Sequence, residues 1–155
     1  MIKCHIRGWM HIEEAKILWQ TIQPYKNCLE LGTFQGLSTW LLAQANTGCK
    51  ITSVEIFEEN INVAKQNCSD YKNIEFVTAD SNEWLSRCQQ KFDWVFVDHS
   101  HESDYMDETI NLLPKCLRED HLVLLHDMHL LGVKQQAYKF ATFTRIRNLG
   151  IGTLW

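Results

Sequence analysis

Short apolar runs that alternate with longer segments of helical spacing constrain the fold of this chain more than any other feature. The apolar runs cover residues 28–31, 51–54, 74–77, 94–97 and 121–125. Apolar strands of this length, separated by helices, are typical of a parallel sheet that is covered on both faces. The sequence therefore predicts an α/β fold with a doubly wound, mostly parallel sheet.

The helical segments and the C-terminus complete this prediction. Helices are expected at residues 12–22, 37–45, 58–67, 82–88, 103–113 and 131–140. Two strand-like runs follow at 143–147 and 151–155, and residues 148–150 between them have the composition of a turn. We predict a closing antiparallel hairpin after five strand–helix units.

Size and composition predict a single domain. The chain has 155 residues, of which 45% are hydrophobic and 22% charged, as is ordinary for a globular protein with a real core. Two prolines and no low-complexity stretch give no sign of a linker. We expect one domain over 1–155, with a lead-in and helix in 1–24 and the core sheet in 27–155.

Charge and cysteine usage restrict the partners and the compartment. A formal net charge of −4 and a pI near 5.9 argue against a nucleic-acid partner. No apolar run is long enough to cross a membrane. The six cysteines show no CxxC pairing, and several fall within apolar strand or helix patterns. This usage predicts reduced thiols and a cytoplasmic protein.

The stretch 28–40 joins an apolar strand, a glycine-bearing loop and the start of a helix. Free N–H groups at a helix N-terminus attract polar ligand groups, and Glu55 at the end of the next strand can accept hydrogen bonds from ribose hydroxyls. The pattern predicts a nucleoside cofactor. Gly32 and Gly36 depart from the G-x-G-x-x-G spacing, and Phe34 stands where a dinucleotide fold often has glycine, which disfavours NAD.

Polar residues follow every predicted strand at the edge where ligands bind in such sheets. They are Gly32 and Thr33, Glu55, Asp80, Asp98 with His99 and His101, and His126 with Asp127. A single acid at a strand end can be a simple helix cap. Four acids that converge from four strands instead predict a binding edge.

These stretches resemble the motifs of the class I S-adenosylmethionine-dependent methyltransferases. The similar stretches are LELGTFQGLST, VEIF with the two following glutamates, FVTAD, FDWVFVDHSHESDY and LVLLHDM, and they occur in the family's order. The last two are similar to a subgroup that modifies small molecules, of the sugar, macrolide or catechol type, at oxygen, and that often uses a divalent metal. The resemblance implies a single-domain Rossmann-like fold with strand order 3-2-1-4-5-7-6.

The resemblance also implies a set of residues that bind S-adenosylmethionine. They are Glu30, Gly32, Thr33, Phe34, Gly36, Ser38, Glu55, Ile56, Asp80, Ser81 and Asp98. The glycine-loop residues would contact the methionine end, Glu55 the ribose, and Asp80 with Ser81 the adenine. Asp98 would lie below the sulfonium.

The predicted chemistry needs a group that takes a proton from the acceptor. His101, Asp98 and Asp127 are the candidate catalytic residues, and histidine has a suitable ordinary pKa. Asp98, His126 and Asp127 are the candidate ligands of a divalent metal such as Mg²⁺ or Mn²⁺, with His101 as the alternative to His126. Two alternatives stay open: a hydrogen-bonded His126 at a half-buried strand end, and a zinc site from His99, His101, His126 and His129.

The resemblance implies O-methylation of a small molecule, such as a sugar hydroxyl. The alternatives are a non-catalytic cofactor-binding or partner subunit and, disfavoured by Phe34, an NAD-type oxidoreductase. The short chain also predicts a homo-oligomer. We expect either the N-terminal segment 1–14, with Trp9 as a lid, or a second subunit to complete the pocket. The acceptor itself is not identified by the sequence.

Overall fold

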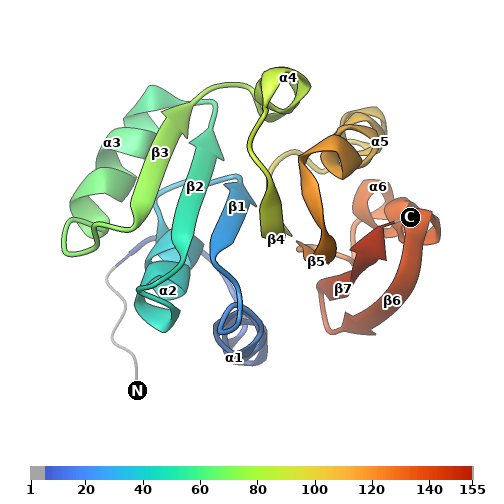
Figure 1. Ribbon diagram of the computed structural model, residues 1–155, viewed down its shortest axis with the longest axis horizontal. Coiled ribbons are helices and arrows are strands. Elements are labelled where there is room, and N and C mark those ends of the chain that lie inside the picture. Colours follow the sequence, from blue (N-terminus) through green and yellow to red (C-terminus); the bar gives the residue numbers. More distant parts are fainter. Residues whose placement is uncertain (1–5, 155) are drawn as a thin grey trace.

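The structure, a computed structural model, describes residues 6–154, which form one seven-stranded sheet with helices on both faces (Figure 1). The strands are β1 (Asn27–Leu31), β2 (Lys50–Glu55), β3 (Ile74–Thr78), β4 (Phe92–Val97), β5 (Leu117–Leu125), β6 (Phe140–Ile146) and β7 (Leu149–Leu154). The helices are α1 (Ile12–Thr21), α2 (Leu37–Ala45), α3 (Glu58–Asn67), α4 (Ser81–Arg87), α5 (Ser103–Leu112) and α6 (Leu131–Lys134), with 3₁₀ turns at Leu113–Cys116 and Gln135–Lys139.

The strand order is β3-β2-β1-β4-β5-β7-β6, which confirms the predicted order. Strands β1 to β5 pair in parallel, and β7 is antiparallel to both β5 and β6. The order reverses between β1 and β4, which are neighbours in the sheet but not in the sequence. Ligands of doubly wound sheets bind at such a switch point, beyond the carboxyl ends of the strands.

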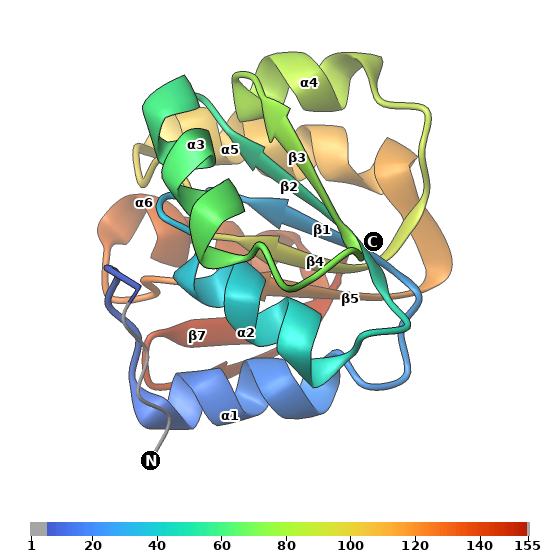
Figure 2. The ribbon, with the colours of Figure 1, turned by 90° about the vertical axis from the view of Figure 1, so that its left-hand side faces the viewer.

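The core consists of two apolar clusters, one on each face of the sheet. Helices α1 and α2 lie on one face of the sheet and α4 and α5 on the other (Figure 2). In β4, Trp94 and Phe96 belong to the cluster under α1 and α2, whereas Val95 and Val97 belong to the cluster under α4 and α5. Successive side chains of a strand point to opposite faces, so a strand buried on both sides must be apolar throughout. This explains why the central strands show no polar alternation in the sequence.

Backbone hydrogen bonds align the ends of the central strands. The N–H groups of Gly32, Asp98 and His126 donate to Val54, Leu31 and Val97 respectively, at 2.8 to 3.0 Å. Each of these donors stands directly after its own strand. The polar residues that follow β1, β2, β4 and β5 therefore lie at one edge of the sheet.

The C-terminal region differs from the prediction in its boundaries. The expected helix at 131–140 is a short α-helix followed by a 3₁₀ turn, and β6 begins at Phe140. The hairpin turns at Arg147 and Asn148, while Gly150 and Gly152 lie inside β7. A Cβ on Gly152 would come 1.9 Å from the Thr142 carbonyl oxygen, so this glycine serves a close approach between strands rather than a turn.

Parts of two predictions lie outside the described residues: the first part of the lead-in, at 1–5, and the end of the second hairpin strand at Trp155. Among residues 6–154, no helix has the length and apolar character needed to cross a membrane.

Candidate active site

The loop between β1 and α2 brings the backbone close to the end of β4. Gly32 and Gly36 have φ values of 99° and 88°, in the left-handed region that glycine adopts without strain. A Cβ on Gly32 would lie 2.2 Å from the Asp98 carbonyl oxygen, so only glycine fits there. Phe34 has a φ of 45°, unusual for a bulky residue, which is typical of backbone held at a functional site.

A cavity of about 610 Å³ opens at this edge of the sheet. It is lined by Gly32, Phe34, Val54, Glu55, Ile56, Phe57, Asn60, Asp80, Ser81, Asp98, His99, Ser100, Glu102 and Tyr105. Hollows of about 610 and 680 Å³ also occur beside α4 and at the opposite edge of the sheet. Position rather than volume therefore identifies the site, because ligands of this fold bind beyond the carboxyl strand ends.

A smaller cavity of about 80 Å³ adjoins the first one. Its walls are Gly8, Trp9, Met10, Gly32, Thr33, Phe34, Leu37, Ser38 and Asp98. The segment before α1 thus covers the loop after β1, as predicted for Trp9. Every predicted cofactor residue except Glu30 and Gly36 lines one of the two cavities.

Glu30 and Gly36 support the loop instead of facing the cavities. Glu30 is fully buried, and its carboxylate accepts hydrogen bonds from the hydroxyls of Thr39 and Ser53. Burial raises the pKa of Glu30 to about 7, against the lowering effect of these hydroxyls. Gly36 is the residue that precedes α2. The geometry therefore favours a role of these two residues in shaping the loop, and their direct contact with the cofactor stays a prediction.

Glu55 is held in place by two backbone N–H groups. The N–H of Phe34 donates to one carboxylate oxygen at 2.8 Å, and the N–H of Phe57 donates to the other at 3.1 Å. An ionised carboxylate offers about four acceptor positions, so two remain for a ligand. Glu55 can therefore accept from the two hydroxyls of a ribose while its own orientation stays fixed.

Asp80 and Tyr105 form the far end of the large cavity. Asp80 accepts the Glu83 N–H at 2.9 Å as the N-cap of α4, and it accepts the Tyr105 hydroxyl at 2.8 Å. Burial opposes the charge on Asp80, but these donors outweigh it and lower its pKa. Burial and the neighbouring Asp80 raise the pKa of Tyr105 to about 12. The pair offers a fixed anionic acceptor beside a neutral phenol.

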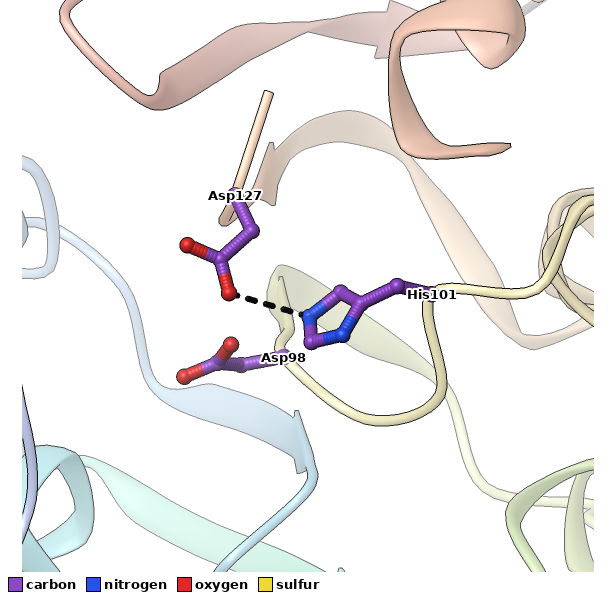
Figure 3. Close-up of side chains that lie close together, drawn as sticks. All are labelled: Asp98, His101 and Asp127. Carbon is purple, nitrogen blue, oxygen red and sulfur yellow. Dashed lines mark ion pairs between the residues drawn. The ribbon is translucent and has the colours of Figure 1, made fainter. Parts of the chain in front are cut away.

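The predicted catalytic residues Asp98, His101 and Asp127 lie together beyond the ends of β4 and β5 (Figure 3). His101 Nε2 lies 3.0 Å from Asp127 Oδ2. Asp127 raises the pKa of His101, and His101 and His126 in turn hold the pKa of Asp127 well below its usual range. Burial raises the pKa of Asp98, an effect that His126 partly offsets.

His126 is buried behind this cluster and does not face the cavities. Its Nδ1 lies 3.0 Å from Asp98 Oδ1, and its Nε2 lies 3.3 Å from Glu14 Oε2. Burial disfavours the charged ring, but the carboxylates of Asp127 and Asp98 outweigh this and raise the pKa of His126 to about 11. Both ring nitrogens thus face carboxylates, which favours the hydrogen-bonded alternative, and His126 as a metal ligand stays a prediction.

A family model described as a methyltransferase domain matches residues 29–128. The chain belongs to this methyltransferase family. The matched stretch contains the loop between β1 and α2, the segment after β4 and all three residues of Figure 3. Helix α1 and the closing hairpin lie outside it.

Solved structures of similar fold include other methyltransferases. The O-methyltransferase TomG from Streptomyces achromogenes, in complex with S-adenosylmethionine, is 16% identical with a TM-score of 0.79, over 94% of this chain and 81% of that one. An O-methyltransferase from Bacillus cereus, in complex with S-adenosylhomocysteine, is 17% identical with a TM-score of 0.75, over 92% and 80%. A Podospora anserina methyltransferase bound to S-adenosylhomocysteine is 11% identical with a TM-score of 0.81, over 95% and 80%. No curated protein matches the chain.

In this methyltransferase domain, Asp98, His101 and Asp127 fit a divalent cation. Each offers one ligand atom, and the three atoms lie within 4.8 Å of one another. Carboxylate oxygens suit Mg²⁺ or Mn²⁺, and an imidazole nitrogen suits softer divalent transition-metal ions. Among the described residues, this is the one group with such spacing, so the four predicted zinc histidines do not form a site.

Three site residues of the methyltransferase domain were missed by the sequence reasoning. Tyr105 lies on α5, and its link to Asp80 spans 25 positions of the chain. His99 was considered as a polar strand-end residue and as a zinc ligand, but burial lowers its pKa to about 4 and its ring packs edge-on against Tyr105. Glu14 has the local pattern of a helix-capping residue, and nothing in the sequence indicates its contact with His126.

Proposed function

We propose that this methyltransferase uses S-adenosylmethionine to methylate a hydroxyl group of a small molecule, such as a sugar. The observation that carries the proposal is one continuous site. Two adjoining cavities run from Asp80 past Glu55 to Asp98, whose carboxylate also belongs to the group with His101 and Asp127. The fold neighbours that bind S-adenosylmethionine or S-adenosylhomocysteine support this choice of cofactor.

The large cavity suits the nucleoside part of the cofactor. Glu55 would accept from the ribose hydroxyls, and Asp80, Ser81 and Tyr105 would surround the adenine. Ile56 offers an apolar side chain at the same rim. This assignment follows from the acceptor capacity that Glu55 keeps after binding two N–H groups.

The small cavity suits the methionine part. Thr33 and Ser38 supply hydroxyls there, and the N-terminus of α2 begins immediately beyond Gly36. Asp98 lies between the two cavities, where a carboxylate attracts both the amino group and the positive sulfur. The loop, the helix end and Asp98 would thus orient the methyl group toward the acceptor side.

The reaction then requires an acceptor oxygen in line with the methyl group and a group that takes its proton. The new bond joins carbon to the acceptor oxygen, the old carbon–sulfur bond breaks with its electron pair going to sulfur, and the proton goes to His101. The 3.0 Å contact with Asp127 stabilises the resulting imidazolium. In the alternative case, Asp98, His101 and Asp127 would hold a divalent cation, and this Lewis acid would lower the pKa of the acceptor hydroxyl in place of a proton transfer to His101.

The decisive experiment is a calorimetric titration with S-adenosylmethionine, S-adenosylhomocysteine and NAD, each with and without Mg²⁺ or Mn²⁺. Binding of the first two and not of NAD is expected. Binding of NAD with no response to S-adenosylhomocysteine would overturn the proposal in favour of the oxidoreductase.

A methyl-transfer assay over a panel of small sugars and phenols separates an enzyme from a non-catalytic subunit. We expect transfer to at least one hydroxyl compound, and we expect His101→Ala to lose it while binding of S-adenosylhomocysteine is retained. Cofactor binding without transfer to any panel member would favour the non-catalytic alternative. EDTA, followed by Mg²⁺ or Mn²⁺, tests the metal in the same assay.

We further propose a cytoplasmic protein, since the six cysteines show no CxxC pairing and several fall within apolar strand or helix patterns. A homo-oligomer without nucleic acid remains our prediction. Light scattering coupled to size-exclusion chromatography measures the oligomeric state directly.

A further inference from the structure

Glu14 is a fully buried carboxylate in the first turn of α1, and the proposed reaction gives it no task. Its two oxygens receive donors from three separate segments. They are the His11 N–H at 3.0 Å, the Asn148 N–H at 3.2 Å and the ring Nε2 of His126 at 3.3 Å. A carboxylate is costly to bury unless donors surround it, so these contacts account for its presence in the core.

The imidazole of His126 connects Glu14 to the site. Its second nitrogen, Nδ1, lies 3.0 Å from Asp98 Oδ1. The ring therefore bridges two carboxylates, with one nitrogen facing each of them. Glu14, His126 and Asp98 therefore form an unbroken series of side chains from the core to a residue that lines both cavities.

The same carboxylate also holds the segment that covers the small cavity. The His11 N–H donates to Glu14, and the three residues before His11 form one wall of that cavity. Gly8 packs so closely that a Cβ there would lie 2.7 Å from a Leu37 methyl carbon. The wall formed by residues 8–10 and the Asp98 carboxylate, which lines the same cavity, thus both depend on the buried Glu14. In Figure 2, α1 lies alongside β7, next to the hairpin turn that holds Asn148.

We propose that Glu14 is a positioning residue of the cofactor site. Through His126 it orients Asp98, and through the His11 N–H it places the covering segment over the methionine end. The inference rests on the proposed function, because Asp98 is the group through which Glu14 acts on the cofactor. Glu14 itself lines neither cavity.

A double-mutant cycle on the binding of S-adenosylhomocysteine tests the series. In Glu14→Gln, an amide presents one oxygen to three donors, so at least one contact is lost. We expect about tenfold weaker binding in Glu14→Gln, and less than about a twofold further loss when it is added to Asp98→Asn. A purely structural Glu14 would instead give the same loss in both backgrounds, which would overturn the proposal.

Glu13→Gln is the matched control. Glu13 stands next to Glu14 in α1 and also links that helix to the hairpin, since its Oε1 lies 3.5 Å from Arg147 Nη2. It makes no contact with His126. We expect unchanged binding of S-adenosylhomocysteine, and a loss like that of Glu14→Gln would mean that any tether of α1 suffices.

Two substitutions of His126 test the series without changing Glu14, in case Glu14→Gln does not fold. Asparagine places an amide donor near the position of Nδ1, toward Asp98, and glutamine places one near Nε2, toward Glu14. Because the series needs both contacts, His126→Asn and His126→Gln should each weaken binding of S-adenosylhomocysteine. Wild-type affinity in His126→Asn would show that Asp98 needs only a local donor and would contradict a role for Glu14.

The wild-type titration distinguishes this inference from the function it rests on. If the wild-type protein does not bind S-adenosylhomocysteine, the proposed function fails and the inference fails with it. If the wild-type protein binds but the cycle is additive, the inference alone fails.

Discussion

The two ends of the site are held by different kinds of contact. At the nucleoside end, Glu55 and the N-cap Asp80 accept backbone N–H groups, which come from the adjoining loops. At the acceptor end, His101 faces Asp127 and Asp98 faces His126, so side chains position one another. Backbone donors are fixed by the fold itself, whereas side-chain pairs depend on both partners. We therefore expect substitutions at the acceptor end to leave the contacts of the nucleoside end intact. The contacts of the acceptor end should be the more sensitive to the loss of a single charge.

The largest effect is expected from His101→Ala. The variant removes the group that takes the acceptor proton, and general-base catalysis contributes about 10²- to 10⁴-fold. We expect kcat to fall in that range while the Kd of S-adenosylhomocysteine changes less than about twofold. Single-turnover methyl transfer and calorimetry measure the two quantities. Equal losses in both would contradict the separation of the two ends.

Gly32→Ala should disturb both ends at once. The new Cβ would lie 2.2 Å from the Asp98 carbonyl oxygen at a residue with a φ of 99°. We expect the free energy of unfolding to fall by about 3 kcal/mol. Chemical denaturation measures this. Gly48→Ala is the control, because a Cβ there meets no atom closer than 3.5 Å, and a similar loss in both variants would exclude the close approach as the cause.

Glu55→Ala should affect the nucleoside end alone. The variant leaves the Phe34 and Phe57 N–H groups without their acceptor and removes the acceptor for the ribose. A hydrogen bond to a charged group contributes about 1.5–3 kcal/mol, so we expect S-adenosylhomocysteine to bind about 10- to 100-fold more weakly. Calorimetry measures the affinity of Glu55→Ala for S-adenosylhomocysteine. Glu59→Ala is the control, because it changes an acid on α3 that lines neither cavity. Equal affinities would show that Glu55 does not contact the ligand.

The smallest effect is a shift in the titration of His101. Asp127 stabilises the protonated ring and raises its pKa above the ordinary value of 6.5, so the ring loses its proton at a higher pH than a free imidazole. Removing the carboxylate in Asp127→Asn should move the midpoint to lower pH. NMR titration of the His101 ring protons in metal-free protein measures this midpoint. Asp104→Asn is the control, because it removes a different carboxylate, in the first turn of α5. A midpoint that stays in place or rises would show that Asp127 does not govern the charge of His101.

Local sequence patterns predicted the nucleoside end well. Glu55 is the last residue of β2, Asp80 stands two residues after β3 and Gly32 directly follows β1, so the parallel sheet alone places them at one edge. The bounds of α2 and α3 also match the prediction, since their helical spacing is unbroken. The roles proposed for these residues remain to be tested.

The acceptor end was less predictable because its contacts join distant parts of the chain. His126 and Asp127 are adjacent in the sequence, yet the structure buries the first and leaves the second near His101. Asp127 has a φ of 54°, and a short pattern does not reveal such a change of direction. The contact between Glu14 and His126 spans 112 positions, and no local signal indicates it.

The sequence by itself determined the strand–helix alternation, the sheet built from it and the edge where the polar residues gather. These follow from periodic burial, which is a property of neighbouring residues. Only the tertiary structure decided between the two candidate histidines, since it is His101 that groups with Asp98 and Asp127, and only the tertiary structure decided that Glu14 lies behind them. Side-chain partners are chosen by packing and charge among elements brought together from across the chain, and that choice exists only once the sheet has formed.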